Sequence, residues 1–333
     1  MASEQLYPQW VEAGVQYLAK DTEGDLSSLS NEKAAVYHAS EAGTKTGATH
    51  DGKYSWHVVK IQNARPLQEE ESLSVDRQGF QLLSHTSVLK DFYNDDDLAS
   101  IYNPEIEKLL LQEIHNAKKI IIFDHTRRSS SSEQRETLHC REPSSVIHND
   151  YTDISAKKRL RDILGESTAS EILNNGRRFA IINVWRPIGG KRTTEEGNRH
   201  GGIDDKHDND IDNDNNVVEN WPLAFCDSTT VNVDEDLVNV KRIAKDRIGE
   251  IQMAHYNSNH RWYYFPRMKN FYEVIIFKTY DSIIQVNDTI QNRFTIHTSF
   301  DDPTCGNSNS EDGGGYIDPS PRQSVETRAF VLF

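Results

Sequence analysis

The sequence predicts a mainly β fold with flanking helices, in which short strands form a barrel or a sandwich. The later part of the chain supplies the main observation, a series of runs rich in β-branched and aromatic residues: RFAIINVWRPI, RWYYFP, EVIIFKTYDS, RFTIHTSF and SVETRAFVLF. Turn-forming loops separate these runs, and such a series is typical of a barrel or sandwich. Two earlier segments show the three- and four-residue spacing of apolar side chains that indicates flanking helices.

The N-terminal half predicts a strand-helix-strand unit. WHVVKIQNA, from Trp56, alternates like a strand, and GFQLLSHTSV follows it from Gly79. NDDDLASIYNPEIEKLLLQEIHNA reads as a helix whose main part starts at Asn103-Pro104, and KKIIIFDH reads as a buried strand. The polar stretch TRRSSSSEQRETLHCREPSS has no hydrophobic period, so we expect a mobile loop there.

The middle of the chain predicts a second helix and an acidic insertion. SAKKRLRDILG indicates a helix with Ser155 as its N-cap and Gly165 near its C-terminal end. From Gly189 to Asn220 the chain has almost no large apolar residue and contains GGIDDKHDNDIDNDNN, which predicts an inserted or disordered loop. Calcium-loop positions are matched by Asp208, Asp210, Asp212 and Glu219. Asn213 replaces the glycine that such a loop needs, so a solvated acidic loop is favoured.

Composition restricts the partners and the location. The 333 residues are enough for one large domain, which we place at residues 51–333, after an irregular, partly helical arm at residues 1–50. A formal charge of -15 would repel phosphate backbones and anionic lipid, so no nucleic acid and no membrane are expected as partners. No apolar run approaches the ~18 residues of a spanning helix. We expect a cytoplasmic protein, and leave a homodimer open.

The cysteines do not suggest a disulfide framework. Cys140, Cys226 and Cys305 are few and scattered, and none belongs to a C-x-x-C pair. We expect reduced thiols without a catalytic role.

A candidate metal site is formed by His148, Asp150 and His297. In an extended segment, residues i and i+2 point to the same side, so His148 and Asp150 can share one metal while Asn149 points away. Two histidines and one carboxylate on one face of an ion are typical of non-haem iron(II), with the opposite face open. H-x-D by itself is a weak signal, but His297 lies where closing strands would return to it. His260 is an alternative third ligand, although a hydrogen-bonding role is favoured.

The last strand carries the candidates for binding a carboxylate. An even number of residues separates Arg322 from Arg328, so both guanidinium groups could point into one barrel and hold a carboxylate in a bidentate fork. The alternative is that they neutralise the acidic surface. Asn183 and Arg186 are polar groups on an otherwise apolar strand, which favours an inward-facing site. The aromatic residues that could line the pocket, or only fill the core, are Trp185, Tyr263 and Tyr264.

The chain also resembles a known family, over roughly residues 55–333. The segments that carry the resemblance are VIHNDYTDISAKKRLRDIL, RFAIINVWRPI, PLAFCDSTTV, NSNHRWYYFPRM, EVIIFKTYDS, FTIHTSFDDP and PRQSVETRAFVLF. They look like the fungal AsaB-like hydroxylase/desaturase family, which includes gibberellin-desaturase-like proteins and is similar to the cephamycin methoxylase component. The resemblance implies a double-stranded β-helix, the jelly-roll or cupin-like fold. It also implies iron(II), 2-oxoglutarate as co-substrate, O2, and ascorbate as an optional reductant.

Matched motif by motif, the resemblance implies His148, Asp150 and His297 as iron ligands and places the carboxylate of 2-oxoglutarate on the arginine strand. Arg322, in an R-x-S setting, is slightly favoured over Arg328. The other cofactor-binding candidates are Asn183, Arg186 and Tyr263. The implied activity is hydroxylation, desaturation or oxidative cyclisation of a small molecule in secondary-metabolite biosynthesis. Two alternatives stay open: an iron oxygenase of this fold that does not use 2-oxoglutarate, and a non-catalytic barrel that binds a small ligand.

Overall fold

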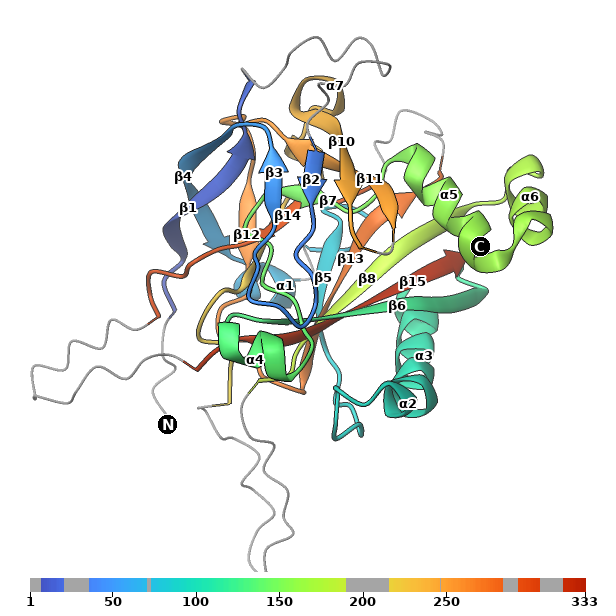
Figure 1. Cartoon of the computed structure of the whole chain (residues 1–333), viewed down its shortest axis with the longest axis horizontal. Helices are drawn as coiled ribbons and strands as arrows, with labels where there is room; N and C mark the ends of the chain where they lie inside the picture. Colours follow the sequence, from blue (N-terminus) through green and yellow to red (C-terminus); the bar gives the residue numbers. More distant parts are fainter. Residues whose placement is uncertain are drawn as a thin grey trace, which may run out of the picture.

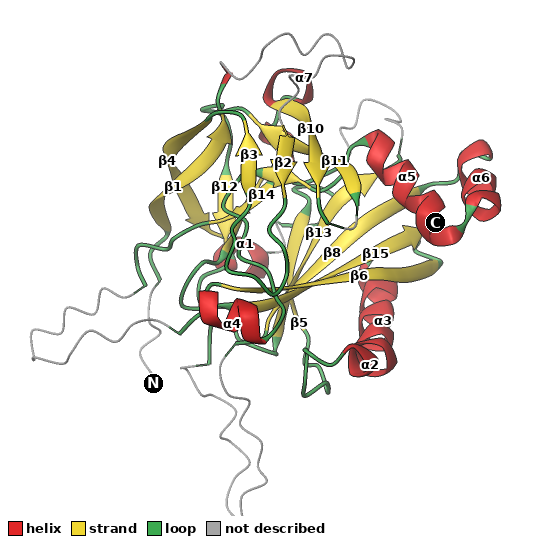
Figure 2. Ribbon diagram, in the orientation of Figure 1, coloured by secondary structure: helices red, strands yellow, loops and turns green. Residues whose placement is uncertain are grey.

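The computed structural model describes residues 7–20, 36–70, 73–189, 216–245, 247–283, 293–305 and 320–333. These residues form two β-sheets with helices packed around them (Figures 1 and 2). The predicted mainly β fold class with flanking helices is confirmed. The two sheets face each other across the centre of the molecule, as in a jelly roll.

The larger sheet carries much of the later half of the chain, but its first strand comes from the N-terminal region. Its strands, in spatial order, are β1 (Trp10–Leu18), β4 (Tyr54–Asn63), β12 (Trp262–Tyr264), β9 (Leu223–Cys226), β14 (His297–Ser299), β7 (His148–Asn149), β11 (Ile248–Ala254), β10 (Leu237–Ile243), β2 (Val36–His38) and β3 (Thr49–Asp51).

The expectation of an irregular, partly helical arm at residues 1–50 is wrong for the part that the structure describes. Strand β1 pairs with β4 along its whole length, from Trp10 opposite Gln62 to Leu18 opposite Tyr54. Val15 and Tyr17 point into the core on the alternating positions of this strand. Outward Glu12, Gly14 and Gln16 alternate with these apolar residues, so the two-residue period was present in the sequence but was not recognised.

The smaller sheet is built from long, nearly continuous apolar strands. In spatial order they are β5 (Phe80–Ser84), β13 (Glu273–Asp281), β8 (Phe179–Pro187), β15 (Gln323–Leu332) and β6 (Lys119–Ser129). Strand β15 pairs with both β8 and β6, and its residues alternate between the two faces of the sheet. Val325, Ala329 and Val331 belong to the cluster that covers one face. The intervening polar residues, Arg328 among them, face the larger sheet.

Helices flank the two sheets. They are α1 (Arg65–Glu69), α2 (Asp95–Asp97), the π-helical η2 (Leu98–Tyr102), α3 (Asn103–Glu113), α4 (Ser132–Thr137), α5 (Asp153–Leu164), α6 (Glu166–Asn174), the 3-10 turn η3 (Ser228–Thr230) and α7 (Val233–Asp236). Helix α3 begins at Asn103, as predicted, and packs Ile106 and Leu110 against the sheet. Helices α5 and α6 lie near the C-terminal end of β15 (Figure 1).

Helix α5 begins earlier than predicted. Thr152, rather than Ser155, is the N-cap: its side chain accepts a hydrogen bond from the backbone N–H of Ser155, whose hydroxyl in turn accepts from the backbone N–H of Thr152. Ser155 is therefore the third residue of a capping box. The predicted C-terminal position of Gly165 is confirmed, because this residue has a φ of 78° and accommodates the turn into α6.

Two further expectations need correction. The stretch expected to be a mobile loop contains the end of β6, helix α4 and Cys140, which is 1% exposed. Strands β10 and β11 were not predicted, although LVNVKRI alternates between buried and exposed side chains.

The acidic insertion falls mainly at residues 190–215, outside the described residues, as do Asp208, Asp210 and Asp212. The three cysteines are free thiols, as expected.

Candidate active site

His148, Asp150 and His297 are brought together by the pairing of two short strands. His148 on β7 lies directly opposite His297 on β14 in the antiparallel register, and their ring centroids are 4.5 Å apart. Asp150 follows β7 on the same side of the chain as His148. One potential ligand atom from each of the three residues lies within 4.8 Å of the others. This is the arrangement that the H-x-D spacing and the late histidine predict.

The two imidazoles are held with the same nitrogen facing the site. Nδ1 of His148 lies 2.8 Å from the carbonyl oxygen of Val146, and Nδ1 of His297 lies 3.1 Å from that of Thr295. With Nδ1 donating to a carbonyl, the Nε2 lone pair of each ring is available to a metal. Burial, with the neighbouring His297, lowers the pKa of His148 to about 4, and burial also lowers the pKa of His297. Both rings are therefore neutral, as metal ligands must be.

Asp150 is oriented by residues of the smaller sheet. Its Oδ2 accepts hydrogen bonds from Nδ2 of Asn183 at 2.7 Å and from Nε of Arg328 at 3.1 Å. Its Oδ1 lies 3.7 Å from Nε2 of His148, a separation that suits two ligands of one ion better than a charged pair, because the imidazole is neutral. Burial alone would raise the pKa of Asp150, but the Arg328 guanidinium, with the hydrogen bond from Asn183, holds it well below its usual range.

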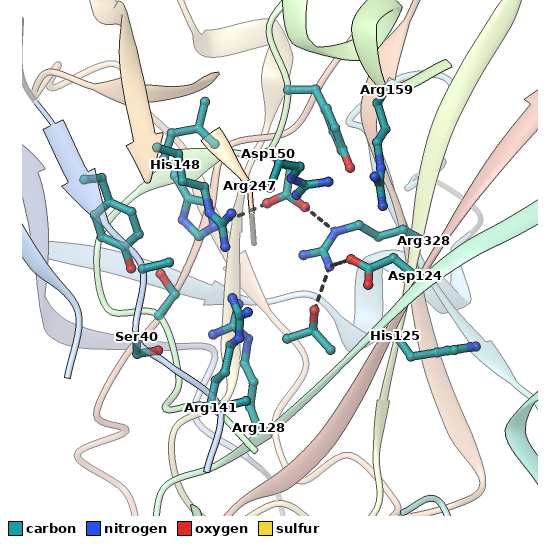
Figure 3. A pocket seen from close by; sticks show the side chains of 18 of the residues that line it. Ser40, Asp124, His125, Arg128, Arg141, His148, Asp150, Arg159, Arg247 and Arg328 are labelled. Atoms are coloured by element: carbon teal, nitrogen blue, oxygen red, sulfur yellow. Dashed lines mark hydrogen bonds and ion pairs between the residues drawn. The ribbon is translucent and has the colours of Figure 1, made fainter. Parts of the chain in front are cut away.

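Arg328 is already surrounded by carboxylates (Figure 3). Besides Asp150, its Nη1 donates to Oδ2 of Asp124 at 2.9 Å, and its Nη2 donates to Glu326. Its Nη1 also donates to the hydroxyl of Thr126 at 2.8 Å. A guanidinium with three carboxylate partners is suited to holding Asp150 in place and has little capacity for a further carboxylate.

Arg322 has the opposite surroundings. Its side chain is 3% exposed, and its guanidinium lies over the ring of Trp185, 5.3 Å from the centroid. It donates to the carbonyl oxygen of Trp221 at 2.5 Å and to the hydroxyl of Ser324 at 3.3 Å, but its Nη2 is buried without a partner. Burial lowers its pKa to about 9. Among the residues that the structure describes, no carboxylate forms an ion pair with it, so this cation fits a carboxylate brought by a ligand.

Arg186 lies on the other face of β8 from Asn183. Residues three apart on a strand point to opposite sides, so the two cannot share one site. Nη1 of Arg186 donates to the backbone carbonyl oxygens of His85 at 2.8 Å and Phe271 at 2.6 Å, and its Nε donates to the hydroxyl of Tyr102. The structure does not bring Arg186 to the triad, and these bonds suit a purely structural role.

The remaining candidates lie in the core. Tyr263 belongs to an aromatic cluster with Phe80, whose ring centroid is 6.0 Å away. Both ring nitrogens of His260 have partners, because Nδ1 lies 3.1 Å from the hydroxyl of Tyr17 and Nε2 lies 3.1 Å from Oδ2 of Asp236. The hydrogen-bonding role favoured for His260 is confirmed.

A cavity of about 610 Å³ reaches the part of the triad formed by His148 and Asp150. His148, Asp150 and Arg328 form part of its wall, together with a group of arginines that the sequence reasoning missed: Arg128, Arg141, Arg159, Arg242 and Arg247. A signal existed for two of them. Arg128 on β6 and Arg242 on β10 occupy the inward positions of alternating strands. Arg141 and Arg247 lie in loops, where no periodicity identifies an inward residue.

Comparison with known proteins places these features in a family. The family model described as "Oxidoreductase/YMDC permease-like domain" matches residues 15–195 and 214–332. In the described part of the chain, no helix has the length and apolar character needed to cross a membrane.

Similar proteins match over nearly the whole chain. Alpha-ketoglutarate-dependent dioxygenase phiK from Fungal sp. (strain ATCC 74256) is 25% identical over 97% of this chain and 96% of its own length. Hydroxylase/desaturase CTB9 from Cercospora beticola is 25% identical, over 84% and 78% of the two chains. The solved structure of the iron and alpha-ketoglutarate-dependent endoperoxidase NvfI has the same fold, with a TM-score of 0.67, 20% identity and coverage of 97% and 98%. The resemblance to fungal hydroxylase/desaturases is confirmed, and the chain belongs to the oxidoreductase family whose model spans it.

Proposed function

We propose that this protein is an iron(II)- and 2-oxoglutarate-dependent oxygenase that hydroxylates, desaturates or cyclises a small molecule in secondary-metabolite biosynthesis. The observation that carries the proposal is the cluster of His148, Asp150 and His297, in which each histidine bonds a backbone carbonyl through Nδ1 and leaves Nε2 for a metal. Two neutral imidazoles and one carboxylate on one side of an ion are the donor set of non-haem iron(II). The full-length likeness to a dioxygenase and to a hydroxylase/desaturase supports the same activity.

Each residue of the site has a separate task in this proposal. His148, Asp150 and His297 hold iron(II), while Asn183 and Arg328 fix the orientation of the Asp150 carboxylate. Arg322 binds the far carboxylate of 2-oxoglutarate, because its buried Nη2 has no partner in the protein. When bound, iron(II) with 2-oxoglutarate and oxygen supplies the oxidation of a carbon–hydrogen bond, with succinate and carbon dioxide formed from the co-substrate.

The proposed activity is tested by following succinate. Protein loaded anaerobically with iron(II) is expected to convert 2-oxoglutarate to succinate and carbon dioxide after oxygen is admitted in the presence of ascorbate, which supplies the two electrons that a substrate would otherwise give. His297→Ala should lose this conversion. His260→Ala is the matched control, because it removes another buried histidine that lies outside the site. Equal succinate formation by wild type and His297→Ala would refute the proposal. Oxidation of a substrate without added 2-oxoglutarate would favour an oxygenase of this fold that uses no co-substrate.

Several finer expectations stay predictions. A cytoplasmic location, the absence of nucleic acid, a homodimer and ascorbate as reductant are supported only by composition or by the proposed chemistry. The net charge of -15 is the argument against nucleic acid. Light scattering of the purified protein tests the homodimer, and the rate of inactivation with and without ascorbate tests the reductant.

A further inference from the structure

The cavity beside the triad is basic, although the protein as a whole is acidic. Eight arginine and lysine side chains line it, against three aspartates, while the whole chain carries a formal charge of -15. Some of these cations are neutralised within the protein. Arg328 has its carboxylate partners, and Lys158 pairs with Asp162 on the same helix, at 2.7 Å. Arg127 pairs with Asp95, so the excess of positive charge comes from the other arginines of the wall.

Four of these arginines form no ion pair with a carboxylate among the residues that the structure describes: Arg128, Arg159, Arg242 and Arg247. Arg128 donates from Nη1 to the neutral carbonyl oxygen of Glu142, at 2.7 Å. Arg242 continues the inward face of β10 after Val238 and Val240, where an apolar residue would be expected. A cation in such a position costs stability unless something neutralises it.

The arginines also act on one another. Burial lowers the pKa of Arg242 to about 10, and neighbouring Arg141 and Arg247 contribute to that shift. Arg159, on α5, also lines the cavity, and its Nε is buried without a partner. In Figure 3, Arg128, Arg141, Arg159 and Arg247 extend toward one open space that is bounded by His148 and Asp150. Like charges converging on a cavity are stabilised when a ligand brings opposite charges.

We propose that this cavity binds a substrate carrying at least two carboxylate groups, which Arg128, Arg242 and Arg247 hold beside the metal site. The inference rests on the proposed function, and it names the class of substrate. 2-Oxoglutarate alone does not account for the cluster, because one of its carboxylates goes to the metal and the other goes to Arg322. The cavity wall also contains Val146, Ile251 and Met253, so the substrate has an apolar body between its acidic groups.

The test measures binding to the metal-free protein by calorimetry, with two probes: benzene-1,3,5-tricarboxylate and decanedioate. The neutral amides of both acids are the control ligands. We expect a carboxylate probe to bind the wild type and its amide not to bind. Arg242→Gln and Arg247→Gln should each weaken binding of the probe about tenfold, the loss expected for one charge-assisted contact. Arg161→Gln, an exposed change on α5 outside the cavity, should leave it unchanged.

Measuring the binding of 2-oxoglutarate as well distinguishes the arginine cluster from the co-substrate site. With manganese(II) in place of iron, Arg322→Gln should lose binding of 2-oxoglutarate and keep binding of the carboxylate probe. Arg242→Gln should bind the probe about tenfold more weakly and keep wild-type binding of 2-oxoglutarate. If Arg242→Gln weakens binding of both ligands alike, the cluster belongs to the co-substrate and the proposal is overturned. Failure of both probes to bind, or equal binding of their amides, also overturns it. A protein that binds the probes but no metal would refute the proposed oxygenase function instead.

Discussion

At the scale of single residues, the site depends on how two arginines of one strand are surrounded. Arg322 and Arg328 both belong to the inward face at β15, but Arg328 lies among three carboxylates and Arg322 has none. The first arrangement stabilises a ligand of the metal, and the second leaves a cation ready for an anion. The two residues should therefore respond in opposite ways to the same substitution.

Arg328→Met should strongly destabilise the protein. The substitution leaves Asp150, Asp124 and Glu326 close together without their common cation, and breaking a buried ion pair from one side costs about 3–5 kcal/mol. Urea unfolding measures the loss. A variant as stable as the wild type would show that other groups neutralise these carboxylates.

Arg322→Met should leave the ligand-free protein as stable as the wild type, or slightly more stable. The substitution removes a buried charge that has no carboxylate partner in the described residues, and a methionine fills similar space beside Trp185. The rise in Tm that manganese(II) and 2-oxoglutarate together cause in the wild type should fall to the rise caused by manganese(II) alone. Retention of the full rise would exclude Arg322 from co-substrate binding.

Sequence reasoning identified the triad and favoured Arg322 over Arg328 only slightly. The H-x-D spacing, the position of the late histidine and the family resemblance together predicted His148, Asp150 and His297 as a group. The choice between Arg322 and Arg328 depends on Asp124 and Trp221, which come from distant segments. No local pattern in the sequence indicates those neighbours.

At the scale of elements, strand periodicity explains both the success and the failures of the prediction. Long apolar strands such as β8 and β15 were recognised because they are buried on both faces. Strand β7 is only two residues long, so the sequence could indicate its ligands but not its pairing with β14. The expectation that Asn183 and Arg186 share a site overlooked the two-residue period of β8, which places them on opposite faces.

His125 connects β6 to α3 and makes a pH dependence testable. Its Nδ1 lies 2.9 Å from Oγ1 of Thr327 and its Nε2 lies 2.9 Å from Oδ1 of Asn103. Burial lowers its pKa from 6.5 to about 4, so the folded protein keeps this ring neutral while the unfolded chain protonates it. Its contribution to stability is therefore present above about pH 6.5 and is lost as the pH falls toward 4.

The measurement is urea unfolding between about pH 7.5, where the ring is neutral in both the folded and the unfolded chain, and about pH 4.5, where only the unfolded chain is largely protonated. The wild type should take up about one proton more than His125→Asn when it unfolds at low pH. The free energy of unfolding of His125→Asn should therefore fall less steeply on acidification. His115→Asn, at an exposed position, is the control. If both variants follow the wild-type curve, protonation of His125 does not contribute to acid unfolding.

At the scale of the whole molecule, the site joins the two sheets. The triad comes from the larger sheet, whereas Asn183 and Arg328 come from the smaller one. A metal and co-substrate bound between the sheets should therefore stabilise the complete fold rather than one part of it. Charge is also distributed unevenly over the molecule. The acidic surface repels anionic ligands, whereas the basic cavity attracts them, so they bind at one place.

Ligand binding should thus raise the stability of the folded state by mass action. At a concentration of manganese(II) about 100 times its Kd, the expected gain is about 2.7 kcal/mol, with a further rise when 2-oxoglutarate is added. The protein should unfold in one cooperative thermal transition, and the whole transition should move to higher temperature when both ligands are added. A transition that splits, with only one part shifting, would show that the ligands do not bridge the two sheets.

The measurement that tests the central claim most directly is the iron content of the protein after anaerobic dialysis against iron(II). Wild type and the control His260→Ala are expected to retain about one iron per chain, the stoichiometry of a single facial site. His148→Ala and His297→Ala should each bind iron about 10–100-fold more weakly or not at all. Retention of iron by both triad variants with wild-type affinity would contradict the account.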